Sequence, residues 1–175
     1  MPRNIFDREL ERLGADLAEM GRQVDAIILD TMHCLKTMDI EAAGRVSGHD
    51  VDINAREKSI EQSCMNLIAL QQPLARDLRA ITATLKIITD MERIGDQAED
   101  IAEIITTLGG RTGAECRDIR VMAEATIKMV TDSVDSFVKR DLDLARAVYT
   151  ADDKVDALFD QVKQELIGMI AKDAS

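Results

Sequence analysis

The sequence predicts an all-α protein of tandem three-helix bundles, the second of them incomplete. Three observations lead to this prediction. Aromatic residues make up 2% of a chain that is 46% hydrophobic, and such a composition favours packed helices over sheets. Apolar residues recur at spacings of 3 and 4 over long stretches, which places them on one face of a helix. The second half of the chain also repeats the first at an offset of 102 residues.

The first long helix is predicted from about residue 5 to residue 38. Its apolar positions are Leu10, Leu13, Leu17, Met20, Val24 and Ile27. This heptad-like stripe continues through Thr31 and Cys34 to Met38, with charged residues between its members. At 1.5 Å per residue the helix would be roughly 50 Å long, a length that suits a helical bundle.

A short helical turn and a second long helix follow. Asp39 is a plausible N-cap for a turn over residues 39–43, and the glycines and serine between residues 44 and 50 predict a loop. The second long helix begins at about residue 50. It is interrupted at Pro73, because proline has no N–H for the helical ladder and disfavours helix in the residue before it.

The third helix is predicted from Pro73 to a C-terminal cap at Gly109. Its first stripe is Leu74, Leu78, Ile81, Leu85 and Ile88. The next step of 4 lands on Glu92, so the stripe turns acidic where it should stay apolar. A neighbouring row takes over the core contact, as the drift of a straight helix against a heptad repeat allows. Its members are Met91, Ile94, Ala98, Ile101, Ile105 and Leu108.

Residues 1–110 therefore form one complete repeat, and residues 111–175 form a second repeat with two long helices only. These helices are expected over about 116–139 and from about 152, with a short turn at 141–148 between them. The inward positions expected are Val121, Met122, Ala125, Met129, Val130, Val134, Phe137, Val155, Leu158, Phe159, Val162, Leu166, Met169 and Ile170. Without a third helix this apolar strip would be exposed, so we expect it to be covered by the first bundle or a second copy, or to be poorly ordered.

The charge and the cysteines narrow the functional classes. A net charge of −11 argues against nucleic acid and anionic lipid as partners, since both favour basic surfaces. Cys34, Cys64 and Cys116 form no CxxC or CxxH pair, and reduced thiols in a cytosolic protein are the simplest account. The charged N-terminal stretch is unlike a signal peptide, and no apolar run is long enough to span a membrane.

An acidic row on the third helix is the main candidate site. Glu92, Asp96, Asp100 and Glu103 recur at spacings of 4, 4 and 3, so their side chains are neighbours on the helix surface. Carboxylates so placed repel one another and need either water or a bound cation. Oxygen ligands alone suit hard cations such as Mg²⁺, Ca²⁺ or Mn²⁺. The alternative is a solvated helix face in a metal-free helical adaptor or scaffold protein.

The stretches Gln72-Pro-Leu-Ala-Arg-Asp-Leu-Arg79 and Glu92-Arg-Ile-Gly-Asp96-Gln-Ala-Glu-Asp-Ile-Ala102 resemble the PhoU family of phosphate-uptake regulators. The resemblance covers the whole chain. It implies two three-helix bundles in tandem, with iron or zinc bound at acidic E/D-x-x-x-D motifs. It also implies a cytoplasmic protein, expected to be a homodimer, that restrains the phosphate ABC transporter through its ATPase and couples it to the phosphate-sensor histidine kinase.

Carried over residue by residue, Glu92 and Asp96 are the E-x-x-x-D pair. Asp100, which stands where the family often has Asn, is the third metal candidate of the row. Asp52 and Glu57 match acidic positions that face the third helix in family members, and they are secondary metal candidates. The second copy of the motif would fall on the helix that this chain lacks, which puts a full two-cluster site in doubt.

The remaining polar residues favour structural readings. A ferritin-like di-iron core needs two Glu-x-x-His motifs, and the chain has only His33 and His49. Cys34 and Cys64 fall on apolar stripes and are expected in the core. Nothing in the sequence indicates an enzyme, and no catalytic residue is assigned. The arginines of the third helix are expected to pair with Asp77, Asp90 or the acidic row; they are Arg76, Arg79 and Arg93.

Overall fold

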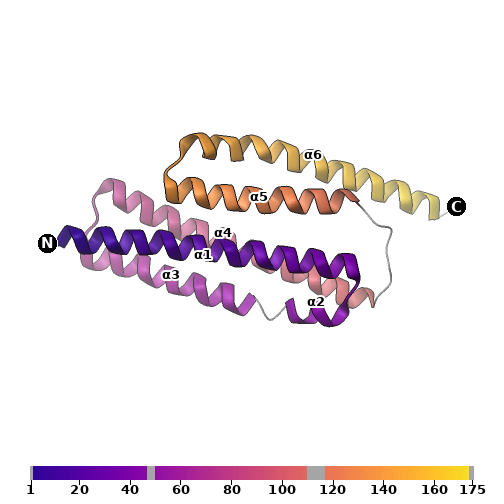
Figure 1. The fold of residues 1–175 in the computed structure, drawn as a ribbon, viewed down its shortest axis with the longest axis horizontal. Helices are drawn as coiled ribbons and strands as arrows, with labels where there is room; N and C mark the ends of the chain where they lie inside the picture. Colours follow the sequence, from indigo (N-terminus) through magenta and orange to yellow (C-terminus); the bar gives the residue numbers. More distant parts are fainter. Residues whose placement is uncertain (1, 47–49, 110–116, 174–175) are drawn as a thin grey trace. The chain divides into compact units, whose positions relative to one another are not determined.

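The computed structural model of the protein describes residues 2–46, 50–109 and 117–173. Its helices are α1 (Pro2–Thr37), α2 (Ile40–Val46), α3 (Asp50–Gln71), α4 (Ala75–Leu108), α5 (Arg117–Lys139) and α6 (Leu142–Asp173) (Figure 1). The described residues contain no strand, so the all-α prediction is confirmed. None of the helices within these ranges is long and apolar enough to cross a membrane.

The chain divides into two compact units, Met1–Gly110 and Arg111–Ser175. In the first unit α1, α3 and α4 pack against one another as a three-helix bundle, and α2 packs on α4 and α1. The second unit is a hairpin of α5 and α6.

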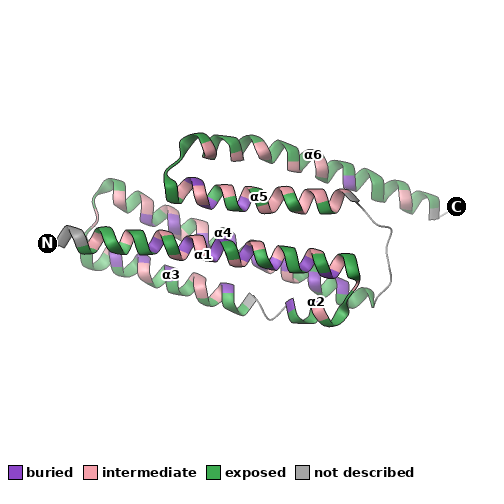
Figure 2. Ribbon diagram, in the orientation of Figure 1, coloured by how far each residue is buried: buried purple, intermediate pink, exposed green. Residues whose placement is uncertain are grey.

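The buried stripe of α1 is the one its sequence predicts. Leu13, Leu17, Met20, Val24, Ile27, Thr31 and Cys34 are all buried. Figure 2 shows that buried residues line the facing sides of α1, α3 and α4. Burial of Thr31 is offset by hydrogen bonds, because its hydroxyl lies 2.8 Å from the Ile27 carbonyl oxygen and 3.2 Å from that of Ala98 on α4. This side chain thus ties α1 to α4.

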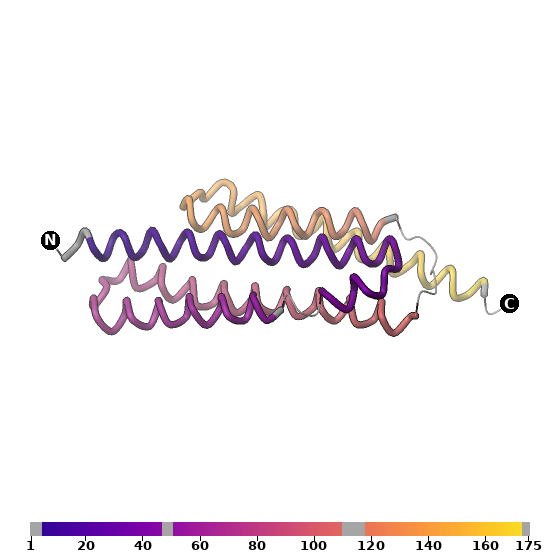
Figure 3. Tube along the Cα trace, turned by 60° about the horizontal axis from the view of Figure 1, so that its bottom comes forward, coloured from indigo at the N-terminus to yellow at the C-terminus, as the bar shows by residue number. Residues whose placement is uncertain are grey.

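Helices α3 and α4 run antiparallel and in close contact (Figure 3). Ile53 of α3 faces Gly95 of α4 in this contact. A Cβ atom at position 95 would lie 3.0 Å from Cδ1 of Ile53 and 3.5 Å from its Cγ2. Glycine costs about 1 kcal/mol against alanine inside a helix, so its place here follows from packing.

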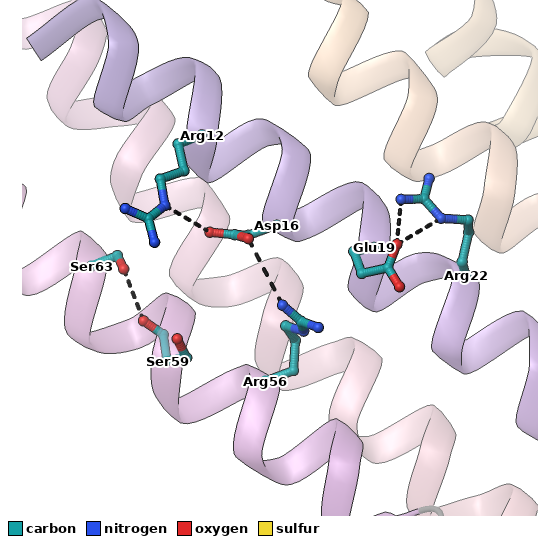
Figure 4. A network of polar contacts seen from close by, with 7 residues as sticks. All are labelled: Arg12, Asp16, Glu19, Arg22, Arg56, Ser59 and Ser63. Atoms are coloured by element: carbon teal, nitrogen blue, oxygen red, sulfur yellow. Dashed lines mark hydrogen bonds and ion pairs between the residues drawn. The ribbon is translucent and has the colours of Figure 1, made fainter.

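An ion pair joins α3 to α1 on the other side of α3. Arg56 Nη1 lies 3.8 Å from Asp16 Oδ1, and Arg12 Nε lies 4.0 Å from the second carboxylate oxygen of Asp16 (Figure 4). Arg56 and Asp16 are about one third exposed. Pairs in such positions contribute up to about 1 kcal/mol, so this contact orients the helices more than it stabilises them.

The internal repeat is visible in two turns of similar geometry. Met38 after α1 and Arg140 after α5 have positive φ angles of 51° and 57°. The next residue in each case is an aspartate that caps the following helix. The carboxylate of Asp39 accepts a hydrogen bond from the Ala42 N–H at 2.9 Å. The carboxylate of Asp141 accepts one from Leu144 at the same distance. Asp39 is the N-cap that the sequence predicts.

After these turns the repeats differ. Helix α2 runs over Ile40–Val46, so the loop predicted from residue 44 is wrong for residues 44–46, and residues 47–49, with His49, lie outside the described residues. The prediction of a separate short turn at 141–148 is wrong, because α6 runs unbroken from Leu142 to Asp173. At the offset of 102, Gly44 and Gly48 correspond to Arg146 and Thr150. Arginine and threonine have higher helix propensities than glycine, which favours an unbroken helix in the second repeat.

The first stripe predicted for the third helix is only partly buried. Ile81 and Ile88 are below 2% exposed, whereas Leu74 is 79% exposed and Leu78 is 38% exposed. The helix begins at Ala75 rather than at Pro73, so Leu74 is its N-cap and lies beyond the last layer of the core. The predicted C-terminal cap is confirmed, since Gly109 is left-handed with a φ of 61°.

Unit 2 buries fewer of its predicted core positions. Val130, Val134 and Val162 are buried, in agreement with the sequence. Phe159 and Ile170 were predicted to point inward but are 55% and 69% exposed, and Leu166 is 41% exposed. A hairpin of two helices covers only one side of each helix, so the apolar residues flanking the contact stripe stay in solvent.

The contact at Gly95 predicts a coupled pair of substitutions. Gly95→Ala gains helix propensity, but its methyl group meets Cδ1 of the buried Ile53, and overpacking costs about 1–3 kcal/mol. We expect a net loss of roughly 1 kcal/mol in the free energy of unfolding, measured by urea denaturation. In an Ile53→Val background, which lacks Cδ1, the same substitution should become neutral or stabilising.

Gly44→Ala in α2 is the matched control for this cycle. A Cβ at position 44 meets nothing within 4 Å, so alanine there should stabilise by up to about 1 kcal/mol. If Gly95→Ala has the same effect with and without Ile53→Val, to within about 0.3 kcal/mol, the two residues are not coupled and the close approach is not the reason for the glycine.

The buried thiol of Cys64 makes stability pH-dependent. Burial, with a smaller contribution from Glu61, raises its pKa from 9.0 to about 11. The native state therefore keeps a proton that the unfolded chain loses, and stability falls as pH rises from about 9 to 11. The slope is at most about 1.4 kcal/mol per pH unit. Denaturation of Cys64→Ala over this range should show a shallower slope than the wild type, and equal slopes would contradict the assignment.

Candidate functional site: the acidic row of α4

The acidic row lies in the second half of α4, beside the buried stripe of that helix. Glu92 and Asp96 are half-buried, and Asp100 and Glu103 are exposed. The predicted handover between stripes is observed, with the core contact passing along Met91, Gly95, Ala98, Ala102 and Ile105. Successive members of the row are three or four residues apart and so lie on one flank of the helix.

Two of the residues predicted to continue the new core stripe are instead exposed. Ile101 is 41% exposed and Leu108 is 43% exposed. The buried stripe follows the small residues Ala98 and Ala102, because small side chains let the neighbouring helices come close. Ile101 and Leu108 lie about 80–100° of helical rotation from the middle of that stripe and are left at its edge.

Glu57 lies on the same flank of the bundle as the row. The hydroxyl of Thr89, three residues before Glu92 on α4, lies 3.5 Å from Glu57 Oε1 on α3 and 3.2 Å from the Leu85 carbonyl oxygen of its own helix. The sequence thus identified an acidic residue of α3 that faces the third helix. In this arrangement Glu57, Glu92 and Asp96 follow the boundary between α3 and α4.

Asp52 lies elsewhere. It is exposed, and on α3 it is one turn before Arg56, which reaches across to Asp16 on α1 (Figure 4). Residues four apart share a helix face, so Asp52 belongs to the flank of α3 that faces α1. Asp52 and Glu57 are therefore on opposite sides of the α3 core stripe, and the structure does not bring the five candidate residues together.

The acidic row lacks the grouping of ligands that a metal ion needs. Across the described residues, no three side chains of His, Cys, Asp or Glu are grouped closely enough to hold an ion. Structural and catalytic metal sites in proteins use three or more protein ligands as a rule. The residues as arranged here therefore do not fit a metal held by the chain alone.

The other polar candidates are His33 and the cysteines. His33 is exposed on α1. Cys34 and Cys64 are buried, as predicted, and burial also raises the pKa of the Cys34 thiol, with the nearby Asp39 and Asp30 adding to the shift. Cys116 lies outside the described residues.

Only one of the three arginines forms a predicted pair. Arg93 Nη1 lies 3.6 Å from Asp90 Oδ1. Arg76 and Arg79 are exposed, and neither makes an ion pair with any residue in the described part of the chain. Together with the exposed Leu74, they mark a surface at the start of α4 that the periodicity argument did not identify. The signal was available in Gln71-Gln72-Pro73, which places Leu74 before the first helical turn.

Comparison with known proteins gives a consistent result. The profile of the PhoU domain matches residues 17–105 and 119–175. A phosphate-specific transport system accessory protein PhoU homolog of Clostridium acetobutylicum is 39% identical over 177 residues, covering 100% of this chain and 81% of that protein. The PhoU accessory protein of Escherichia coli is 31% identical, covering 97% of this chain and 70% of its own length.

Solved structures agree with these sequence relatives. PhoU from Pseudomonas aeruginosa superposes with a TM-score of 0.89 at 32% identity, over 97% of this chain and 82% of that one. The phosphate transport system regulatory protein PhoU from Streptococcus pneumoniae gives a TM-score of 0.88 at 25% identity, over 95% of this chain and 79% of that one. The helical-bundle fold and both matched segments place the chain in the PhoU family.

Proposed function

We propose that the protein is a cytoplasmic negative regulator of phosphate uptake and of phosphate-regulon signalling. It acts by binding the ATPase of the phosphate ABC transporter and the phosphate-sensor histidine kinase. The observation that carries the proposal is similarity along nearly the whole chain to proteins named as accessory to phosphate-specific transport. The proposal includes a homodimer, for which light scattering would give twice the chain mass of 19.4 kDa.

The physical character of the surface supports action by binding rather than by chemistry. Long helices present rigid rows of charged and apolar side chains, and such rows suit recognition of other proteins. The acidic row and the exposed arginines of α4 give the first unit surfaces of opposite sign. We assign no reaction to the protein.

A metal-free adaptor is the second candidate function, and one observation favours it. No group of three potential metal ligands exists within the described residues. In this version the acidic row contacts water or a basic protein surface, and regulation does not depend on a metal. In the metal-bearing version, Glu92, Asp96 and Asp100 would hold iron, zinc or a hard divalent cation only with ligands added from outside the described side chains.

The regulatory proposal can be tested in a bacterial strain whose own PhoU-family gene has been deleted. Such a strain should express a phosphate-regulon reporter even in phosphate-rich medium. Expression of this chain should restore repression and reduce phosphate uptake, because the chain would again restrain the transporter and the kinase. Persistent reporter activity, in cells where the chain is shown to be present and folded, would reject the proposal.

Metal analysis of the purified protein separates the two versions. If metal is bound at the row, Glu92→Ala/Asp96→Ala should lose it while circular dichroism shows unchanged helix content. Asp152→Ala/Asp156→Ala is the matched control, because it removes an exposed acidic pair of the same spacing from α6. A wild type without iron, zinc or other divalent metal above background would establish the metal-free version.

A further inference from the structure

The turn between α3 and α4 carries a surface in which leucines and arginines are exposed together. Leu70, in the last turn of α3, is 76% exposed, and Leu74 is 79% exposed. Leu78, one helical turn further along α4, is 38% exposed. Arg76 and Arg79 are exposed in the first two turns of α4, on a different flank of the helix from Leu74 and Leu78, and because helical side chains tilt toward the N-terminus they extend toward the same end of α4. We call these five residues the end patch.

The backbone holds the end patch in a defined shape. Helix α3 ends at Gln71, Gln72 has a positive φ of 46°, and Pro73 restricts the next φ angle. Helix α4 then starts at once, with the Leu78 N–H donating to the Leu74 carbonyl at 3.0 Å. Leu74 and Leu78 are four residues apart and share one face of the helix. The apolar side chains are thus presented from a rigid turn.

The choice of residues at this turn works against local stability. Leu74 is the N-cap of α4 and makes no side-chain capping hydrogen bond. Ser, Thr, Asp or Asn at that position would satisfy one of the free N–H groups of the first turn, and leucine forgoes this. A lone exposed leucine needs no explanation. Two highly exposed leucines on either side of one short turn, one of them at a cap position, point to a role outside the folded chain.

The charge of the end patch differs from that of the protein. The chain carries a net charge of −11, yet residues 70–79 contain two arginines and one aspartate. Neither arginine is paired with another described residue, so their charges are available to a partner. The uncapped N-terminus of α4 adds to the positive potential. A complementary surface would offer Asp or Glu carboxylates around an apolar centre.

We propose that the end patch docks a protein surface of that chemistry, with Leu70 and Leu74 in its apolar centre and Arg76 and Arg79 facing its carboxylates. The inference rests on the proposed function and names the face of this chain that would make the contact. An anionic membrane is the weaker occupant. Two arginines supply little attraction to a bilayer when the rest of the chain carries an excess of negative charge.

Binding to two purified proteins tests the proposal: the phosphate-transporter ATPase and the cytoplasmic part of the phosphate-sensor kinase. Leu70→Gln/Leu74→Gln should raise the Kd for at least one of them by about tenfold or more, as expected for buried apolar anchors. Arg76→Glu/Arg79→Glu should slow association and remove the weakening that added salt causes in the wild type. Thermal melting should show that both variants remain folded.

Matched controls remove leucine-like bulk and positive charge elsewhere in the same unit. Leu29→Gln/Met65→Gln alters residues that are 55% and 52% exposed on α1 and α3. Lys58→Glu/Lys86→Glu reverses two exposed charges away from the turn. Both controls should bind within about twofold of the wild type, which separates the end patch from general surface effects.

The outcomes separate failure of the docking assignment from failure of the proposed regulatory function. If the wild type binds and both end-patch variants bind equally well, the docking assignment is wrong while the regulatory function stands. If the wild type binds neither protein, the proposed function fails and the docking assignment fails with it. If flotation with phosphatidylglycerol–phosphatidylethanolamine vesicles shows wild-type binding that the end-patch variants lose, while protein binding is unchanged, the occupant is a membrane and the protein-partner proposal is overturned.

Discussion

The close approach of α3 and α4 at Ile53 and Gly95 determines much of the first unit. It allows the buried stripe of α4 to pass through small residues in the second half of the helix, where Ala98 and Ala102 follow Gly95. With the backbones close together, polar residues flanking the contact are brought to the boundary between the helices. Glu57, Thr89, Glu92 and Asp96 lie along that boundary. A larger residue at position 95 would separate the two flanks and change the spacing of every carboxylate across them.

The repeat shows how one local motif is kept while its surroundings change. A left-handed residue followed by an aspartate cap occurs at Met38–Asp39 and again at Arg140–Asp141. A non-glycine residue with positive φ costs roughly 1–2 kcal/mol, and the cap following it offsets about half of that or more. Beyond the cap, the first repeat has two helices, α2 and α3, whereas the second repeat continues as the single helix α6. The turn and its cap are thus kept in both repeats while the helices that follow differ.

Sequence periodicity predicted the interior of the first bundle well and its ends poorly. The α1 stripe and the handover to Met91 and Ala98 follow from spacing, because the middle of a long amphipathic helix has one possible inward face, whereas the Asp39 cap follows from residue type. Leu74 was assigned to the core because it continues a spacing of four, but a residue at a helix end can keep the spacing and still lie beyond the last core layer. Spacing shows which face of a helix a residue occupies, and this identified the acidic row. Spacing does not show how deep in the bundle the residue lies, and Leu74 was misplaced for that reason.

Asp52 shows that spacing along one helix does not identify the neighbouring helix that a residue faces. Two acidic residues of α3 looked equivalent in sequence, yet they lie on opposite flanks because five residues rotate a helix by about 140° beyond one full turn. Only Glu57 faces α4. Choosing between them required the position of the α3 core stripe relative to both neighbours, which a single helix does not contain. The ion pair between Arg56 and Asp16 supplies that position.

The charges along α4 run against the helix dipole, and this links the two candidate surfaces. Anions are favoured near a helix N-terminus and cations near its C-terminus, by about 0.3–1 kcal/mol each within the terminal turns. Helix α4 has an exposed arginine and an uncapped leucine at its start, Asp77 as its one acid there, and no basic residue in its last turn. Its acids gather in the C-terminal half instead.

Departures from local stability rules concentrate at functional sites in natural proteins, and on this helix they coincide with the end patch and the acidic row. One rigid element of 34 residues, roughly 50 Å long, therefore presents a basic and apolar surface at one end and an acidic surface toward the other. The two surfaces therefore use different side chains of the same helix.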